Sequence, residues 1–231
     1  MVLRAWAVAA ALIVTALLLV VAAFLARRTM QVPFLGRFTE PTLIINDVPT
    51  WADHDPGLHS LDQLIALDDQ PLEDTTALMR VLVQYKAGDV VTLKARGEDG
   101  TLREVQQVSL GALPGKAWIG FFVIPAILGL IYLGLGIWVL VARWHESAGQ
   151  VFALLCAVLA LGLGLWFDVY TTHWFSGVWI AALSLVGSVF AHLALVFPQR
   201  VRFLNRTPAL RYLVYVPGVV IAIVNQFTIL D

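Results

Sequence analysis

The chain has 231 residues, of which 59% are hydrophobic and 13% are charged, and its formal net charge is -1. A typical soluble domain is about half apolar and about a quarter charged, so this composition excludes an ordinary water-soluble globule and a disordered chain. It also excludes nucleic-acid binding through a basic surface. The single cysteine, Cys156, excludes an internal disulfide framework and a cysteine-built zinc site.

The apolar residues gather in long stretches that predict membrane-spanning helices. A helix needs about 20 apolar residues to cross the hydrocarbon core of a bilayer. Five stretches meet or approach this length, at residues 5–26, 117–142, 149–167, 177–197 and 210–230. Pro125 and Pro217 are expected to kink or adjust the second and the fifth span, because proline cannot donate the backbone hydrogen bond of a helix interior.

The first stretch, residues 1–26, predicts a retained anchor rather than a cleaved signal peptide. Its apolar run is about twice as long as a typical signal core, and residues 24–28 form a poor cleavage site. Arginines in short loops predict the orientation, since such loops stay in the cytoplasm. Arg143 follows the second span, and Arg200, Arg202 and Arg206 follow the fourth. We therefore expect a multi-pass protein of the bacterial inner or plasma membrane, with a cytoplasmic N-terminus and residues 27–116 outside.

Residues 27–116 predict a small α+β domain inserted between the first two spans, because they hold 22 of the 31 charged side chains. Short apolar runs at 43–45 and 64–67 predict two strands. A helix is expected to follow from Asp74 or Thr75, and Gly88 ends it. Its apolar face consists of Ala77, Leu78, Val81, Leu82 and Tyr85. Two further strands are expected at 90–96 and 102–110, joined through Glu98-Asp99-Gly100.

Residues 55–58 and 61–72 resemble the bacterial PDZ pattern, in which a small residue and Gly-Leu precede a strand that ends in Asn/Asp-Gly. The helix and the Gly88-Asp89 strand start also match the order of that family. The resemblance implies capture of a peptide C-terminus on a glycine-rich loop, beside the helix. Here the candidate loop, residues 34–38, contains Leu35 and a single glycine, Gly36, and the candidate helix face contains Leu78 and Leu82.

The order of the segments resembles bacterial sensor histidine kinases of the competence or quorum-sensing type. His192-Leu-Ala-Leu-Val-Phe-Pro198 is similar to a His-Phe-x-Leu-x-Phe-Pro span ending in their membrane modules. The resemblance implies the sensory half of a two-component signal-transduction protein, a homodimer with a peptide or protein ligand. The sequence has no phosphoacceptor helix and no nucleotide-binding glycine boxes, so we expect the kinase to lie outside this chain. We therefore expect no enzyme activity within it.

Two other classes of protein stay open, a PDZ-bearing membrane protease or its adaptor, and a transporter subunit. His145-Glu146 begins a zinc-protease motif, but Gly149 stands where the second histidine is needed. Ser188 and His192 have the spacing of a nucleophile and its base, yet oxyanion donors are missing. His192 is instead a candidate for signalling within the membrane, because a costly ionisable group there suggests a function, but a structural hydrogen bond across helices is the commoner role. A transporter would need mid-bilayer polar groups.

Few residues in the sequence suit a transporter cavity, a metal site or a ligand site in the loop between the third and fourth spans. Ser184, Ser188 and Asn225 are the polar groups available to a transporter cavity. His54 and His59, beside several aspartates, form a candidate for a divalent metal, although a solvated turn is the commoner use of such residues. Asp168 and His173 bracket the loop between the third and fourth spans, where they could pair or face a ligand, although an ordinary solvated loop is the expected arrangement. We expect no metal, no cofactor and no catalytic residue, and the lipid bilayer as the main partner.

Overall fold

The computed structural model describes residues 2–48, 57–197 and 211–230. The chain is mostly helical and divides into two compact units. The helical unit comprises Met1–Ala22, Ile124–Trp166 and Phe175–Asp231, and the polar unit comprises Ala23–Val123 and Phe167–Trp174. Four apolar helices among the described residues are long enough to cross a membrane: Leu3–Thr29, Gly115–Ala142, Ser147–Tyr170 and Ser176–Val196. These helices indicate a multi-pass membrane protein.

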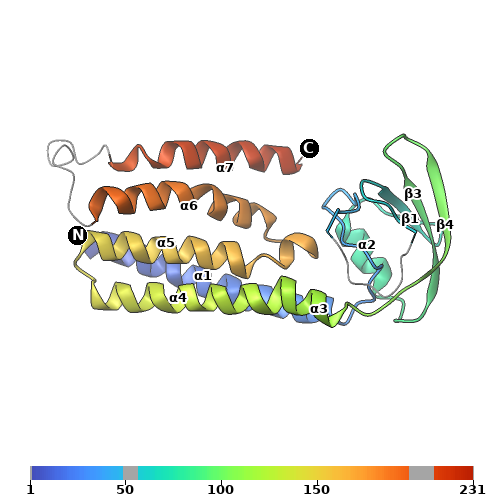
Figure 1. Ribbon diagram of the computed structural model, residues 1–231, viewed down its shortest axis with the longest axis horizontal. Coiled ribbons are helices and arrows are strands. Elements are labelled where there is room, and N and C mark those ends of the chain that lie inside the picture. Colours follow the sequence, from blue (N-terminus) through green and yellow to red (C-terminus); the bar gives the residue numbers. More distant parts are fainter. Residues whose placement is uncertain (1, 49–56, 198–210, 231) are drawn as a thin grey trace. The chain divides into compact units, whose positions relative to one another are not determined.

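The helical unit is a set of helices that lie side by side (Figure 1). Its helices are α1 (Val2–Thr29, which ends in the polar unit), α4 (Ile124–Ala142), α5 (Ser147–Gly164), α6 (Ser176–Val196) and α7 (Tyr215–Leu230). Consecutive helices from α4 to α7 pack against one another. Leu12 and Leu19 of α1 pack with buried residues of α4 and α5, among them Leu133 and Ala157.

The fifth predicted span is shorter than expected. Helix α7 begins at Tyr215 and has 16 residues, so it is about 24 Å long at about 1.5 Å per residue. The hydrocarbon core is about 30 Å thick. Pro217 explains the late start, because a proline is tolerated in the first turn of a helix, where its missing N–H has no partner to lose. The prediction of a kink at Pro217 within a longer span is therefore wrong.

The second span has an irregular beginning, as Pro125 predicts. It consists of α3 (Gly115–Trp118), the π-helix η1 (Ile119–Val123) and α4. Proline at 125 cannot donate to the carbonyl four residues earlier, and a π-helical turn is one way for the backbone to absorb that loss. The change of helix type ends directly before Pro125, which confirms the expected adjustment.

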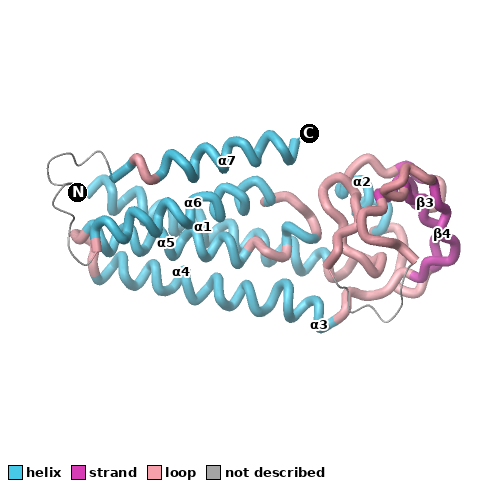
Figure 2. Tube along the Cα trace, turned by 45° about the horizontal axis from the view of Figure 1, so that its top comes forward, coloured by secondary structure: helices cyan, strands magenta, loops and turns pink. Residues whose placement is uncertain are grey.

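The polar unit contains a small antiparallel sheet and the helix α2 (Figure 2). It also includes the end of α1, the elements α3 and η1, and the short 3-10 helix η2 (Asp168–Tyr170). The strands are β1 (Gln63–Leu67), β2 (Gln70–Pro71), β3 (Val90–Arg96) and β4 (Leu102–Ser109), in the order β2-β1-β3-β4, and the helix is α2 (Thr75–Leu82). The strands expected at 64–67, 90–96 and 102–110 are confirmed within one residue. The run at 43–45 is not a strand: it forms only single bridges, because the positive φ of Leu43 (63°) interrupts the extended backbone.

Helix α2 packs its apolar face into the core of the polar unit. Asp74 caps the helix, and its carboxylate accepts a hydrogen bond of 2.6 Å from the Ala77 amide. Leu78, Val81 and Leu82 are buried in one cluster with residues of the sheet. The predicted cap is confirmed, and Leu78, Val81 and Leu82 of the predicted apolar face are turned inward. The helix ends at Leu82 and not at Gly88, so the expectation that Tyr85 belongs to it is wrong.

Candidate functional site

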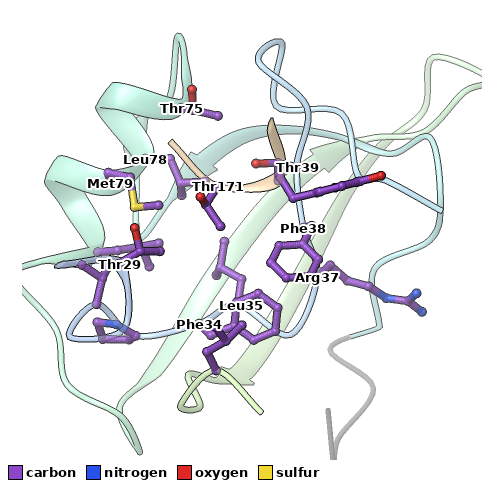
Figure 3. A pocket seen from close by; sticks show the side chains of 15 residues that line it. Thr29, Phe34, Leu35, Arg37, Phe38, Thr39, Thr75, Leu78, Met79 and Thr171 are labelled. Carbon is purple, nitrogen blue, oxygen red and sulfur yellow. The ribbon is translucent and has the colours of Figure 1, made fainter. Parts of the chain in front are cut away.

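A small cavity of about 50 Å³ lies in the polar unit between α2 and the segment that follows α1 (Figure 3). Helix α2 contributes Thr75, Leu78, Met79 and Leu82 to its wall, and the facing segment contributes Phe34, Leu35, Phe38 and Thr39. In Figure 3 the side chains of Leu78 and Met79 face this segment, whereas Arg37 extends away from the helix. The cavity is therefore an apolar space between a helix and an irregular segment.

Three of the four residues predicted for ligand binding line this cavity. Leu35, Leu78 and Leu82 are each at most 4% exposed, so they reach a ligand only if the cavity opens. Gly36 has a φ of 88°, a left-handed conformation that glycine adopts without strain, and it turns the chain between Leu35 and Arg37. It is not among the lining residues. The structure thus brings together the predicted loop and the predicted helix face, and their binding role stays a prediction.

The third wall of the cavity comes from the loop between α5 and α6, which sequence reasoning did not place here. Tyr170 and Thr171 line the cavity from this loop. The Tyr170 ring lies 6.0 Å from the Phe38 ring and 5.2 Å from the Phe121 ring, between centroids, in tilted and edge-on packing. The sequence predicted a solvated loop here, although the number of aromatic residues in so short a loop could have indicated buried packing.

His173 fixes the same loop by a hydrogen bond to the segment opposite α2. Its Nε2 lies 3.0 Å from the carbonyl oxygen of Thr39. A carbonyl can only accept, so Nε2 carries the proton and donates it. Within the part of the chain that the structure describes, the buried Nδ1 has no hydrogen-bond partner. The bond to Thr39 therefore fixes the orientation of the ring, while Nδ1 is left without a partner among the described residues.

Burial lowers the pKa of His173 below its usual value, because a charged imidazole loses its hydration there. The hydrogen bond to Thr39 and the negative charge of Asp168 oppose this shift. Asp168 is itself buried and accepts a hydrogen bond from the Thr172 hydroxyl, while its backbone carbonyl accepts one of 2.9 Å from the His173 amide. The two residues that bracket the loop thus organise its backbone.

His192, the candidate for signalling within the membrane, lies in the helical unit. Its Nδ1 shares a hydrogen bond of 2.9 Å with the hydroxyl of Tyr215, and its ring packs edge-on against those of Tyr212 and Tyr215. Ser188 is buried where α6 meets Gly218 of α7. The pairing of His192 with Tyr215 supports a contact between helices rather than a catalytic dyad with Ser188.

The other candidate sites do not assemble into metal centres. Glu146 is ion-paired with Arg143 at 2.7 Å, and Asp62 accepts a hydrogen bond of 3.0 Å from the His59 amide. Among the described residues, no three or more His, Cys, Asp or Glu side chains are grouped so as to hold a metal ion. His54 lies outside the described residues.

Comparison of the chain with known proteins gives no match to a family model, to a curated protein or to a solved structure. A functional conclusion therefore has to be argued from the geometry of the site, because a fold alone does not determine function. The cavity between α2, segment 34–39 and the α5–α6 loop is the feature on which that argument rests.

Proposed function

We propose that this chain is the sensory input region of a membrane signal-transduction protein, and that its polar unit is a PDZ-like receptor for a peptide or protein ligand. One observation carries the proposal: the same cavity is lined by α2, by segment 34–39 and by the loop that joins α5 to α6. A ligand in this cavity would touch a loop whose two ends continue into candidate membrane spans.

The position of the cavity supports a PDZ-like mode of binding. In that mode an extended peptide adds as a strand beside a helix, its main chain pairs with an exposed backbone edge, and its carboxylate sits on backbone N–H groups. Segment 34–39 supplies such a backbone opposite α2. The carbonyl oxygen of Thr39 accepts its hydrogen bond from His173, where the amide of a bound peptide would donate instead. The α5–α6 loop therefore occupies part of the position that a ligand would take.

Because the α5–α6 loop fills part of the proposed ligand position, its displacement suggests how ligand binding would be transmitted to α5 and α6. A cavity of about 50 Å³ has room for a few water molecules only, so a peptide would have to displace Tyr170 and Thr171. A ligand shifts an equilibrium only by its difference in affinity for two states. Here the two states are the loop packed against Phe38 and the loop released. Release would free the ends of α5 and α6, and we propose that a histidine-kinase output and a homodimeric assembly read this change.

A peptide-binding experiment on the full chain in detergent micelles tests the proposal. The probes are synthetic pentapeptides with a free carboxylate and a C-terminal Val, Leu or Phe, and the same peptides amidated at the C-terminus are the control. We expect the free-carboxylate peptides to bind and to accelerate amide hydrogen exchange across residues 170–173. Binding that leaves this exchange unchanged would contradict the coupling, and absence of binding by every peptide would contradict a PDZ-like ligand.

Two substitutions on α2 and its C-cap provide a matched pair. Met79 is half-buried and lines the cavity, whereas Val83 at the C-cap is 65% exposed and lies outside its wall. We expect Met79→Glu to weaken peptide binding about tenfold or more, since a carboxylate would have to be desolvated beside the ligand. Val83→Glu should leave the affinity unchanged. Equal effects of the two variants would show that the cavity is not the binding site.

A further inference from the structure

A second, larger cavity of about 380 Å³ lies in the helical unit, at the end where α1 and α5 begin and α6 ends. Its volume falls within the range of about 300–1,000 Å³ that is typical of small-molecule sites. The apolar part of its wall consists of Ala7 and Val8 of α1 and Val151 and Leu154 of α5. It is therefore suited to an apolar chain that lies along these two helices.

The polar part of the wall is cationic. Arg4 and Arg211 both approach the ring of Tyr212, with guanidinium carbons 5.6 and 5.1 Å from its centroid. None of the described residues that line the cavity is acidic. The buried Nε of Arg211 has no hydrogen-bond partner among the described residues. Two like charges that line one cavity and an unpaired buried donor both cost free energy, and an anion bound in the cavity would reduce both costs.

Aromatic side chains place this end of the helical unit at the level of a membrane interface. The rings of Trp6 and Trp144 pack edge-on with centroids 5.5 Å apart. Tryptophan favours the headgroup region, where its ring is half in apolar and half in polar surroundings. His192 and Tyr215, joined by their hydrogen bond, also line the cavity. A molecule bound here would thus have its charged group at headgroup depth and its apolar part toward the bilayer.

We propose that this cavity binds an anionic phospholipid, with its phosphate between Arg4 and Arg211 and one acyl chain along Val8, Val151 and Leu154. Arginine forms paired, charge-assisted hydrogen bonds with phosphate oxygens, and basic pockets between membrane helices suit lipid headgroups. The apolar wall distinguishes such a lipid from a free soluble anion. The site is separate from the cavity of the polar unit, so the proposal of lipid binding does not depend on the proposed receptor function.

Native mass spectrometry of the full chain, released from neutral detergent, measures this binding. The probes are phosphatidylglycerol and phosphatidylcholine with identical acyl chains, added in titration, with glycerol 3-phosphate as the headgroup without a chain. We expect phosphatidylglycerol to bind at least tenfold more tightly than phosphatidylcholine, and glycerol 3-phosphate not to displace it. Equal affinity for the two lipids, or displacement by glycerol 3-phosphate at matched concentration, would overturn the proposal, the latter in favour of a soluble anion.

Substitutions of residues that line the cavity test whether the lipid binds there. Arg4→Gln and Arg211→Gln should each weaken phosphatidylglycerol binding about fivefold, the effect of one basic residue near an anionic lipid surface. Arg143→Gln is the matched control, because Arg143 is exposed and already ion-paired with Glu146. Ala7→Phe should weaken binding of both lipids, because the larger side chain would fill part of the space for the acyl chain. An equal loss in Arg143→Gln would place the lipid elsewhere. If a glutamine variant fails to fold, the comparison of the two lipids and the Ala7→Phe variant still test whether the cavity binds an anionic phospholipid.

Discussion

His173 joins the α5–α6 loop to segment 34–39 through one side-chain hydrogen bond, which its Nε2 donates to the carbonyl oxygen of Thr39. The sequence predicted that Asp168 and His173 bracket this loop, and an ordinary solvated loop was expected, with pairing or ligand binding as alternatives. That expectation is wrong, since Asp168 and Thr171 are buried. It did not predict Thr39 as the partner of His173, because a side chain that donates to a backbone carbonyl 134 positions away leaves no local pattern. The same holds for Tyr170 and Phe38, whereas Leu78 and Leu82 were predictable from helical periodicity.

Acidification is expected to loosen the α5–α6 loop. Burial lowers the pKa of His173 in the folded protein below its ordinary value of 6.5, so the released or unfolded loop binds a proton more readily than the packed one. The stabilising contribution is therefore complete above about pH 6.5 and is lost as the pH falls toward the lowered pKa. Amide hydrogen exchange of residues 170–174, measured from pH 7.5 to 5 and corrected for its intrinsic pH dependence, should reveal increasing opening.

His173→Gln is the control for this titration. A glutamine amide retains a donor for the Thr39 carbonyl but does not titrate in this range. Its loop should therefore open to the same extent at pH 7.5 and pH 5. If the glutamine variant loosened on acidification as the unmodified protein does, a group other than His173 would be responsible.

The helices were predicted better than the irregular elements, for a physical reason. A run of about 20 apolar residues has few alternatives to a membrane helix, so α1, α4, α5 and α6 lie where the composition placed them. Helix α7 and residues 43–45 differ from expectation because the backbone at a single position determines the structure of each. Pro217 sets the start of α7, and the left-handed Leu43 interrupts a strand. Such local choices depend on tertiary contacts that hydropathy does not encode.

Close contact between α4 and α5 depends on Gly129. A Cβ atom added at Gly129 would lie 3.1 Å from the Ala160 carbonyl oxygen and 3.2 Å from the Gly164 amide nitrogen, both of them backbone atoms. Neither atom moves without shifting a helix. Gly134, on the same helix, has no atom within 4 Å of its added Cβ.

These two glycines predict opposite effects of the same substitution. Gly129→Ala should destabilise the helical unit by about 1–3 kcal/mol, because it overpacks an interface that is already in contact. Gly134→Ala should be neutral or stabilise it by up to about 1 kcal/mol, since alanine is the better helix former. Denaturant titration of helicity in mixed micelles measures both. A loss of stability in Gly134→Ala equal to that of Gly129→Ala would contradict the role of this contact.

At the scale of the whole molecule, the polar unit is more than an insertion between two spans. The sequence predicted it as the continuous segment 27–116, whereas the compact unit in the structure also includes Phe167–Trp174. The chain therefore passes between the two units four times, at residues 22–23, 123–124, 166–167 and 174–175. A unit tied to the membrane helices by four chain connections is better suited to transmit a change in its packing than a domain on a flexible tether.

The orientation inferred from the loop arginines makes a prediction about the two units. Short loops rich in arginine stay in the cytoplasm, so the turn between α4 and α5 should be cytoplasmic and the polar unit should lie outside. Glu98 and His145 are exposed positions in these two places. The single native cysteine, Cys156, is 1% exposed and should not react with a polar maleimide, so the new cysteine is the only target in each variant.

In spheroplasts with an intact inner membrane, a membrane-impermeant maleimide should label Glu98→Cys directly. It should label His145→Cys only after the membrane is permeabilised. The unmodified chain, carrying Cys156 alone, should stay unlabelled in both conditions. Labelling of His145→Cys alone in the intact state would place the polar unit in the cytoplasm. A ligand of the cavity beside α2 would then come from inside the cell, and the proposed receptor would respond to an internal signal.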